Sequence, residues 1–172
     1  MNSTNETKIE IIRGIKEKKL IVGIYHCLHY VQEHHESFLE FWCGWIDYNT
    51  FIINPKMIAH ISGRKDNSIN KNFRNHGFVG KRANSDIKKK ACQYYNIRSL
   101  PDPSGWMIRC CEKFNQSSTE DDVKKIKFIE NDKYTKKPIT QNHFTIEVSE
   151  YGNNYDDLDD YFEYQSDSFY FD

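Results

Sequence analysis

Residues 63–78, GRKDNSINKNFRNHGF, gather basic and amide side chains in a chain whose formal net charge is only −1. The segment holds two lysines, two arginines and four asparagines, with one aspartate. Arginine can donate two hydrogen bonds to guanine, asparagine can pair with adenine, and lysine neutralises phosphate. This combination of residue types on one short segment predicts contact with nucleic acid.

A helix would place most of these polar side chains on one surface. Ile69 and Phe73 are four residues apart and form the apolar stripe that we expect to be buried. At about 100° per residue, Lys71 then points directly away from the stripe. The same outer half also carries Asn67, Ser68, Arg74 and Asn75. Asn70 and Asn72 lie at its two edges. The apolar stripe itself is expected to pack against Met57, Ile58, Ile61 and Trp45 or Trp106.

The residues just before this segment predict a second short helix. Asn54 is a good N-cap, and Pro55 fits the first helical turn, where its missing N–H costs nothing. Gly63 is expected to end this helix, and Asp66 or Asn67 to cap the next one. Two short helices joined by a tight turn form a helix-turn-helix.

The other elements follow from hydrophobic spacing and turn residues. Helical spacing over residues 11–42 predicts one or two helices, broken at residues 43–45. The predicted strands are TFIIN (50–54), FVGKR (78–82) and GWMIRCCEKF (105–114). Residues 83–102, with their lysine run, are expected to be a loop that forms or decorates the wing. Residues 117–126 predict a last short helix. We therefore expect a mainly α fold with a small antiparallel β-sheet, a winged helix-turn-helix.

The near-neutral net charge hides a strong asymmetry along the chain. Residues 147–172 carry nine acidic residues and no lysine or arginine, which leaves the rest of the chain at +8. Residues 64–90 alone sum to +7, which indicates a polyanionic partner. The basic residues of that stretch are Arg64, Lys65, Lys71, Arg74, Lys81, Arg82, Lys88, Lys89 and Lys90.

This asymmetry suggests a division into three parts. Residues 5–130 are interpreted as a winged-helix DNA-binding domain, and residues 131–146 as a connector without a clear signal. Residues 147–172 are expected to be a disordered acidic, aromatic tail. One hypothesis is that this tail competes with DNA for the basic surface, and another is that it docks other transcription proteins.

Other classes of protein find little support in the sequence. No apolar run reaches the roughly 18 residues of a membrane span, and the polar N-terminus lacks a hydrophobic signal region, so we expect a soluble intracellular protein without a membrane partner. The five cysteines and seven histidines match no familiar zinc spacing. The sequence contains no Ser-His-Asp arrangement of a hydrolase, no phosphate-binding loop and no set of metal ligands. We therefore predict that the protein is not an enzyme and has no cofactor. Asp102, His60 and His76 are interpreted as turn, packing or cap residues.

A longer block around the first segment carries a family resemblance. CGWIDYNTFIINPKMIAHISGRKDNSINKNFRNHGFV, residues 43–79, resembles the initiator-binding domain of trichomonad parasites. LPDPSGWMIR and FNQSSTEDDVKKI are similar to the later part of that domain, and the resemblance covers roughly residues 8–128. It implies a winged helix that recognises the initiator element at transcription start sites. Carried over by motif, the turn and recognition helix hold Lys65, Asn67, Ser68, Asn70, Lys71 and Arg74, and the wing region holds Lys81, Arg82 and Lys88 to Lys90.

Two functions are therefore compared. The first is sequence-specific binding of double-stranded promoter DNA in the nucleus, with the acidic tail as a contact for the transcription machinery. The alternative is a winged helix that binds protein without reading DNA. A protein-binding helix face should carry aromatic or aliphatic anchors. The predicted outer face carries asparagine, serine, lysine and arginine instead, which favours the first function.

Overall fold

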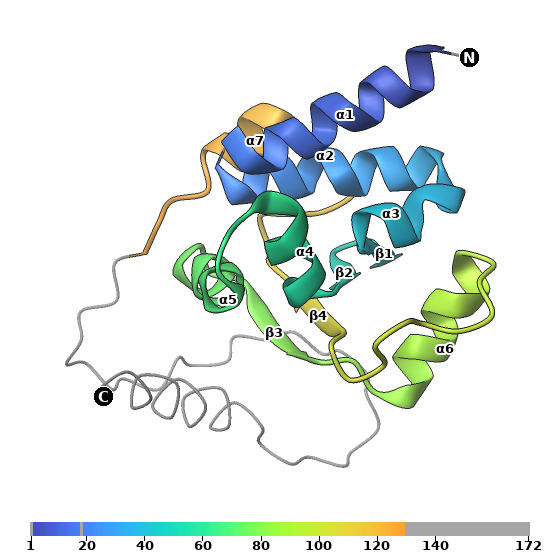
Figure 1. Cartoon of the computed structure of the whole chain (residues 1–172). Helices are drawn as coiled ribbons and strands as arrows, with labels where there is room; N and C mark the ends of the chain where they lie inside the picture. The colour runs from blue at the N-terminus through green and yellow to red at the C-terminus, as the bar shows by residue number, and fades with distance from the viewer. Residues whose placement is uncertain (1, 18, 130–172) are drawn as a thin grey trace, which may run out of the picture. The chain divides into compact units, whose positions relative to one another are not determined.

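The computed structural model describes residues 2–17 and 19–129, which belong to one compact unit that ends at Ile129 (Figure 1). The connector and the acidic tail predicted for residues 131–172 lie outside the described residues. The helices are α1 (Asn2–Glu17), α2 (Leu20–Glu33), the 3-10 turn η1 (His35–Ser37), α3 (Phe38–Phe41), α4 (Pro55–Ser62), α5 (Asp66–Asn75), α6 (Ser85–Tyr94) and α7 (Glu120–Lys124). The strands are β1 (Cys43–Asp47), β2 (Thr50–Ile53), β3 (Val79–Arg82) and β4 (Met107–Cys110).

The N-terminal third forms two long helices rather than one. α1 ends at Glu17 and α2 begins at Leu20, so Gly23 lies inside α2 and does not break it. Gly23 serves close packing instead, because a Cβ atom there would come within 2.7 Å of the Ile15 Cα in α1. The helical spacing predicted the helix type and left the number of helices open, and the structure has separate helices that end at Glu17 and begin at Leu20.

A strand occupies the position where the sequence predicted only the end of a helix. Trp42 adopts a left-handed conformation with φ 55°, which ends α3 and turns the chain sharply. Cys43–Asp47 then forms β1, which pairs antiparallel with β2. The break predicted at residues 43–45 is real for the helix, but the segment continues as a strand whose first four residues are buried.

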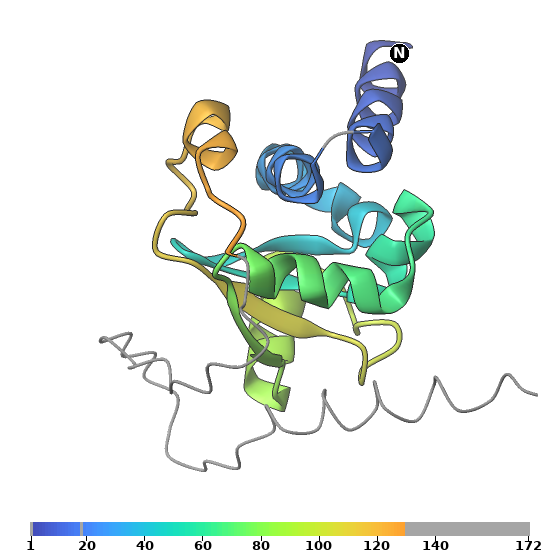
Figure 2. The ribbon, with the colours of Figure 1, turned by 90° about the vertical axis from the view of Figure 1, so that its left-hand side faces the viewer.

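The four strands form one antiparallel sheet in the order β1-β2-β4-β3. β3 and β4 are the wing, and they pair with Gly80 directly opposite Arg109. Figure 2 shows α1, α2 and α7 on one side of the sheet and α6 on the other. The expected fold, mainly α with a small antiparallel sheet in a winged helix-turn-helix arrangement, is confirmed.

An aromatic cluster joins α5 to the sheet. The Phe51 ring in β2 has its centroid 5.9 Å from Phe73, 5.6 Å from Trp45 and 5.7 Å from Phe114. Ile69 and Phe73 are fully buried, as predicted. Among the described residues, the rings that pack on Phe73 are those of Phe51 and Phe78, and not the tryptophan that the sequence predicted.

Candidate DNA interface

The helix-turn-helix is formed by α4 and α5, and local contacts fix its turn. Asn54 caps α4, because its Oδ1 accepts a hydrogen bond from the Met57 N–H at 3.2 Å, and Pro55 follows at the first helical position. Gly63 ends α4 with φ 65°, a left-handed conformation that suits glycine. The Arg64 N–H then donates to the Ala59 carbonyl oxygen at 3.0 Å. The predicted N-cap Asn54, the first-turn Pro55 and the terminating Gly63 are therefore confirmed.

The start of α5 differs from the prediction. The helix begins at Asp66, so the N-cap position falls on Lys65, which makes no side-chain capping bond. Asp66 and Asn67 are therefore the first two helical residues, and the prediction that one of them is the cap was wrong. Ser68 stabilises the first turn of α5, because its Oγ donates a hydrogen bond to the Lys65 carbonyl oxygen at 2.6 Å. Its hydroxyl is thus engaged within the first turn of the helix.

The other end of α5 is closed by its own residues and by the last described residues. Gly77 has φ 79°, and its N–H donates to the Arg74 carbonyl oxygen at 3.0 Å. His76 Nδ1 lies 2.7 Å from the Asn72 carbonyl oxygen, and the His76 ring packs on Phe128 with centroids 5.5 Å apart. The Ile129 N–H donates to the Asn75 carbonyl oxygen. The C-terminal end of the candidate recognition helix is therefore held in place.

The outward face of α5 has the composition predicted for it. Lys71, on the side away from the buried Ile69 and Phe73, is exposed, and so are Asn67 and Arg74. The helical register derived from the apolar stripe is therefore correct. Four of the predicted DNA-contacting residues on or beside this helix are half-buried, namely Arg64, Ser68, Asn70 and Asn75.

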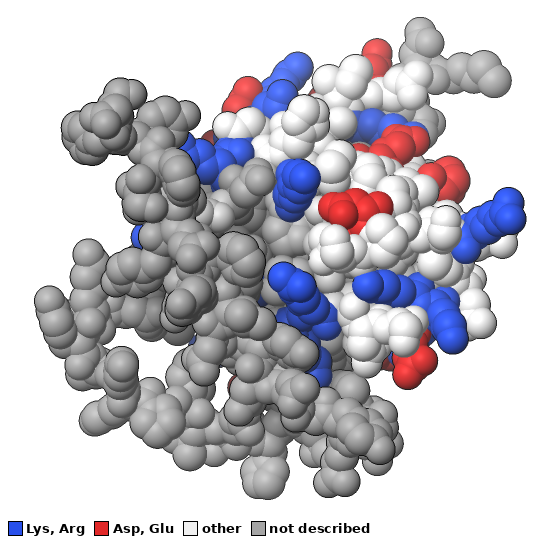
Figure 3. Space-filling model, turned by 60° about the horizontal axis from the view of Figure 1, so that its bottom comes forward, with Lys and Arg blue, Asp and Glu red and all other residues white. Residues whose placement is uncertain are grey.

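Basic side chains also lie on the segments that flank α5. Lys65 is exposed in the turn that precedes the helix, and Lys81 and Arg82 are exposed on β3, the wing strand that follows it. Figure 3 shows lysine and arginine side chains in small groups on the visible face, with acidic groups interspersed. The exposed Lys65, Lys81 and Arg82 thus lie on the segments directly before and after α5.

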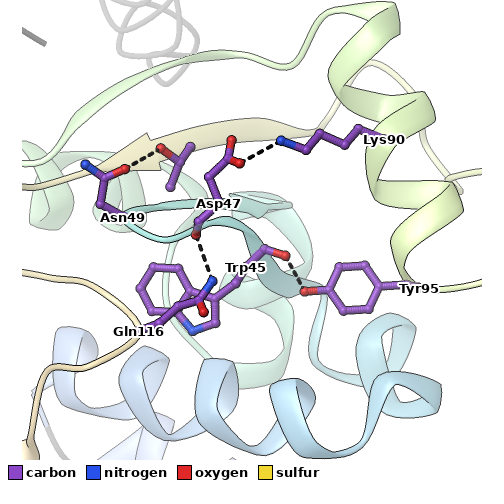
Figure 4. Close-up of polar contacts among 7 residues, drawn as sticks. Trp45, Asp47, Asn49, Lys90, Tyr95 and Gln116 are labelled. Carbon is purple, nitrogen blue, oxygen red and sulfur yellow. Dashed lines mark hydrogen bonds and ion pairs between the residues drawn. The ribbon is translucent and has the colours of Figure 1, made fainter. Parts of the chain in front are cut away.

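The lysine run from Lys88 to Lys90 lies on a helix, not on the loop that we expected. Asn84 caps α6 by accepting from the Ile87 N–H at 2.9 Å. Lys90 pairs with Asp47 at 2.7 Å, as Figure 4 shows, whereas Lys89 is exposed and Lys88 half-buried. The run therefore comprises one exposed lysine that pairs with the last residue of β1 and two further lysines on the same helix.

Tyr95 anchors the end of α6 against the sheet. Its Oη donates to the Trp45 carbonyl oxygen at 2.6 Å (Figure 4), and its ring stacks on Phe38 with centroids 4.1 Å apart. Burial raises the pKa of the Tyr95 phenol well above its ordinary value, so the phenol stays protonated and donates this bond. The basic helix inserted in the wing is consequently rigidly placed.

Arg109 is a residue that the sequence interpretation missed. It extends from β4 and is buried, with its guanidinium carbon 5.4 Å from the centroid of the Phe73 ring. Its Nη2 donates to Asn70 Oδ1 and, more weakly, to Met107 Sδ at 3.6 Å. A Cβ atom on Gly80 would overlap this guanidinium, so the glycine leaves room for it. The sequence signal was an arginine inside the apolar run WMIRCC, residues 106–111, of a predicted strand.

Two further side chains on α4, Lys56 and His60, lie near Arg64, and Lys56 was not among the predicted DNA contacts. A shallow hollow is lined by Lys56 and His60, which are four residues apart on one side of α4, and by Arg64 in the turn that follows. In helix-turn-helix proteins the first helix crosses the DNA backbone. This hollow lies at the end of α4 that leads into the turn, because Gly63 is also among its lining residues.

No helix among the described residues is long and apolar enough to cross a membrane. Within residues 2–17 and 19–129, no cluster of three histidine, cysteine or acidic side chains could hold a metal ion. Asp102 sits in a turn with φ 45°, where its Oδ1 accepts from Ser104 Oγ at 3.3 Å, as its interpretation as a turn residue predicted.

Together, the paired short helices, the basic amide-rich α5 and the β3–β4 wing define a winged helix-turn-helix of the DNA-binding type. The family model described as transcription-initiator DNA-binding domain matches residues 2–116, and the chain belongs to this family. Membership makes DNA binding in transcription initiation the function of this domain. No curated protein and no solved structure gives a significant match to the chain.

Proposed function

We propose that this protein binds double-stranded promoter DNA in a sequence-specific manner, at an initiator-like element, with α5 in the major groove. The observation that carries the proposal is the outward face of α5. Asn67, Lys71 and Arg74 are exposed on the side opposite the buried apolar stripe. A major groove admits one helix, and these side chains have the donors that base edges and phosphates accept.

The contacts divide into base reading and backbone contact. Arg74 and the amides of Asn67, Asn70 and Asn75 face the bases, since arginine and asparagine discriminate between base edges. The backbone contacts come from the turn, from two residues of α5, from the wing and from the inserted helix, namely Arg64, Lys65, Ser68, Lys71, Lys81, Arg82, Lys88, Lys89 and Lys90. Lysines act mainly as point charges against phosphate, so this second group sets affinity and orientation rather than sequence preference.

The alternative, a protein-interaction module, fits the surface of α5 less well. Interface anchors are enriched in tryptophan, tyrosine and other large side chains. The exposed residues of α5 are asparagine, lysine and arginine, whereas its apolar residues Ile69 and Phe73 are buried. A protein partner would therefore find charge and amides on this helix but no apolar anchor.

The proposed function places the protein in the nucleus and gives the acidic C-terminal residues a regulatory role. Residues 147–172 carry nine carboxylates and no basic side chain, so they can compete with DNA for the basic surface or dock other parts of the transcription machinery. Truncation after Ser149 should raise duplex affinity, and the gain should be larger at low salt. Equal duplex affinity of the truncated and full-length chains at low salt would exclude self-competition.

Selection of bound sequences from a randomised duplex pool tests the proposed function. The full chain should enrich one sequence motif. The triple variant Asn67→Ala, Lys71→Ala, Arg74→Ala should lose this enrichment. A matched control removes the same three residue types from the exposed surface of α1, as Asn5→Ala, Arg13→Ala, Lys16→Ala, and should keep the motif. A wild-type chain that enriches no motif would refute sequence-specific binding.

A further inference from the structure

The contact between Arg109 and Asn70 determines which way the Asn70 amide faces. A guanidinium group only donates hydrogen bonds, so its partner on an asparagine must be the oxygen and not the nitrogen. Arg109 Nη2 is bonded to Asn70 Oδ1, which places the amide oxygen toward the junction between α5 and the wing. Rotating the amide by 180° would set two donors against each other and is therefore excluded.

The position of Arg109 is itself tightly determined. The guanidinium lies over the Phe73 ring, and a cation in this position is attracted by the face of the ring. Gly80 is paired directly opposite Arg109 across β3 and β4, and its missing side chain provides the space that the guanidinium occupies. Because Arg109 is only 6% exposed, it acts from within the protein and does not compete for DNA.

The nitrogen of the Asn70 amide remains available to donate a hydrogen bond to a ligand. Among the hydrogen bonds of residues 2–17 and 19–129, none involves Asn70 Nδ2, and the side chain is half-buried at the edge of the outward face. Bidentate recognition of adenine needs the asparagine oxygen and nitrogen side by side toward the base. With its oxygen held by Arg109, Asn70 can present only its nitrogen in that way.

We propose that Arg109 is a positioning residue that holds the Asn70 amide with its oxygen inward, so that Asn70 reads a hydrogen-bond acceptor on a base edge. In the major groove such acceptors are purine N7, guanine O6 and thymine O4, whereas the amino groups of adenine and cytosine are donors. The proposal rests on the proposed function and names the chemical class of base atom that one position of α5 recognises.

Two substitutions at position 70 test the outward donor. Asn70→Asp keeps an oxygen for Arg109 and turns their contact into a salt bridge between two charged groups, so its melting temperature should equal or exceed that of wild type. It replaces the outward donor by a negatively charged acceptor. Both Asn70→Asp and Asn70→Ala should lower the ratio of affinities for the preferred and scrambled duplexes by about 5- to 150-fold. Using this ratio corrects for the charge effect that Asn70→Asp has on every duplex.

Base analogues identify the acceptor. The preferred duplex is prepared with 7-deazapurines, with 2-aminopurine in place of guanine, and with a thymine analogue that lacks O4, one position at a time. At one position the wild type should lose about 5- to 150-fold in affinity, and Asn70→Ala should lose nothing further there. Fully additive losses at every position, or an unchanged duplex ratio for Asn70→Ala, would overturn the inference.

A third variant tests the positioning role of Arg109. Arg109→Met removes the donor and frees the Asn70 amide to rotate, so the base preference should broaden at the position identified above and persist at the others. The double variant Asn70→Ala, Arg109→Met should have the same ratio of affinities for the preferred and scrambled duplexes as Asn70→Ala alone. An Arg109→Met chain that folds and keeps the wild-type preference at that position would overturn the positioning role. If this variant unfolds, the stability and duplex ratio of Asn70→Asp still decide the orientation of the amide.

A wild-type chain with no preferred duplex would instead refute the proposed function, before any substitution is made.

Discussion

Phe73 of α5 and Phe51 of β2 pack with their ring centroids 5.9 Å apart, and both side chains are fully buried. This contact attaches the candidate recognition helix to the central part of the sheet. Phe73→Ala should lower the free energy of unfolding by about 3–5 kcal/mol, because it removes a large buried ring and leaves a cavity. Chemical denaturation measures this change, with Ile9→Ala on the exposed surface of α1 as the control. A Phe73→Ala chain as stable as wild type would contradict the burial of this face.

Gly80 should tolerate no side chain. In Gly80→Ala the new methyl group would overlap the Arg109 guanidinium, so Arg109 must leave its place over Phe73. The variant should lose both thermal stability and preference between duplexes, because the displaced arginine no longer holds Asn70. Lys81→Ala on the same strand is the control and should leave stability within about 0.5 kcal/mol of wild type. A Gly80→Ala chain with wild-type duplex preference would show that Arg109 does not position the Asn70 amide.

The three lysines of α6 should not contribute equally to DNA affinity. Lys90 is paired with Asp47, whereas the other two lie on the helix surface. Lys88→Ala with Lys89→Ala should weaken binding to every duplex similarly and flatten the salt dependence by about 0.9 per lost phosphate contact. Lys90→Ala should have a smaller effect on this slope. Binding titrations over a range of salt concentrations measure it, and an unchanged slope in the double variant would place α6 away from the DNA.

The stability of the domain should fall as the pH falls below about 6.5. His29 of α2 is half-buried against Tyr25, with ring centroids 4.3 Å apart, and burial lowers the pKa of His29 from its ordinary value of 6.5. The unfolded chain therefore takes up a proton at a higher pH than the folded chain, so acid favours unfolding in this range. Denaturation at a series of pH values should show a shallower decline for His29→Gln. The same pH dependence in both chains would exclude His29 as a source.

The parts of the site that could be predicted from the sequence are those set by local geometry. Asn54, Pro55 and Gly63 fix the bounds of α4 through backbone requirements that each residue type meets on its own. The spacing of Ile69 and Phe73 fixed the outward face of α5, because a helix buries residues four apart on one side. Local signals were therefore sufficient for the helix-turn-helix and for the exposure of Lys71.

The parts that were missed depend on contacts between distant segments. Arg109 acquires its role only because Gly80 lies opposite it in the sheet and Phe73 lies beneath it. α6 was taken for a loop because of its lysines, although lysine is a good helix former and Ile87, Ala91 and Tyr95 recur every four residues. In that case a signal was present in the sequence but the charge run was given more weight.

One measurement tests the central claim, that α5 reads sequence, most directly. It is the affinity of wild type and Arg74→Ala for the preferred duplex and for a scrambled duplex at one fixed salt concentration. The account predicts that Arg74→Ala loses about 1–3 kcal/mol on the preferred duplex and clearly less on the scrambled one. An equal loss on both duplexes would make Arg74 a phosphate contact, and no loss on either would contradict the placement of α5 in the major groove.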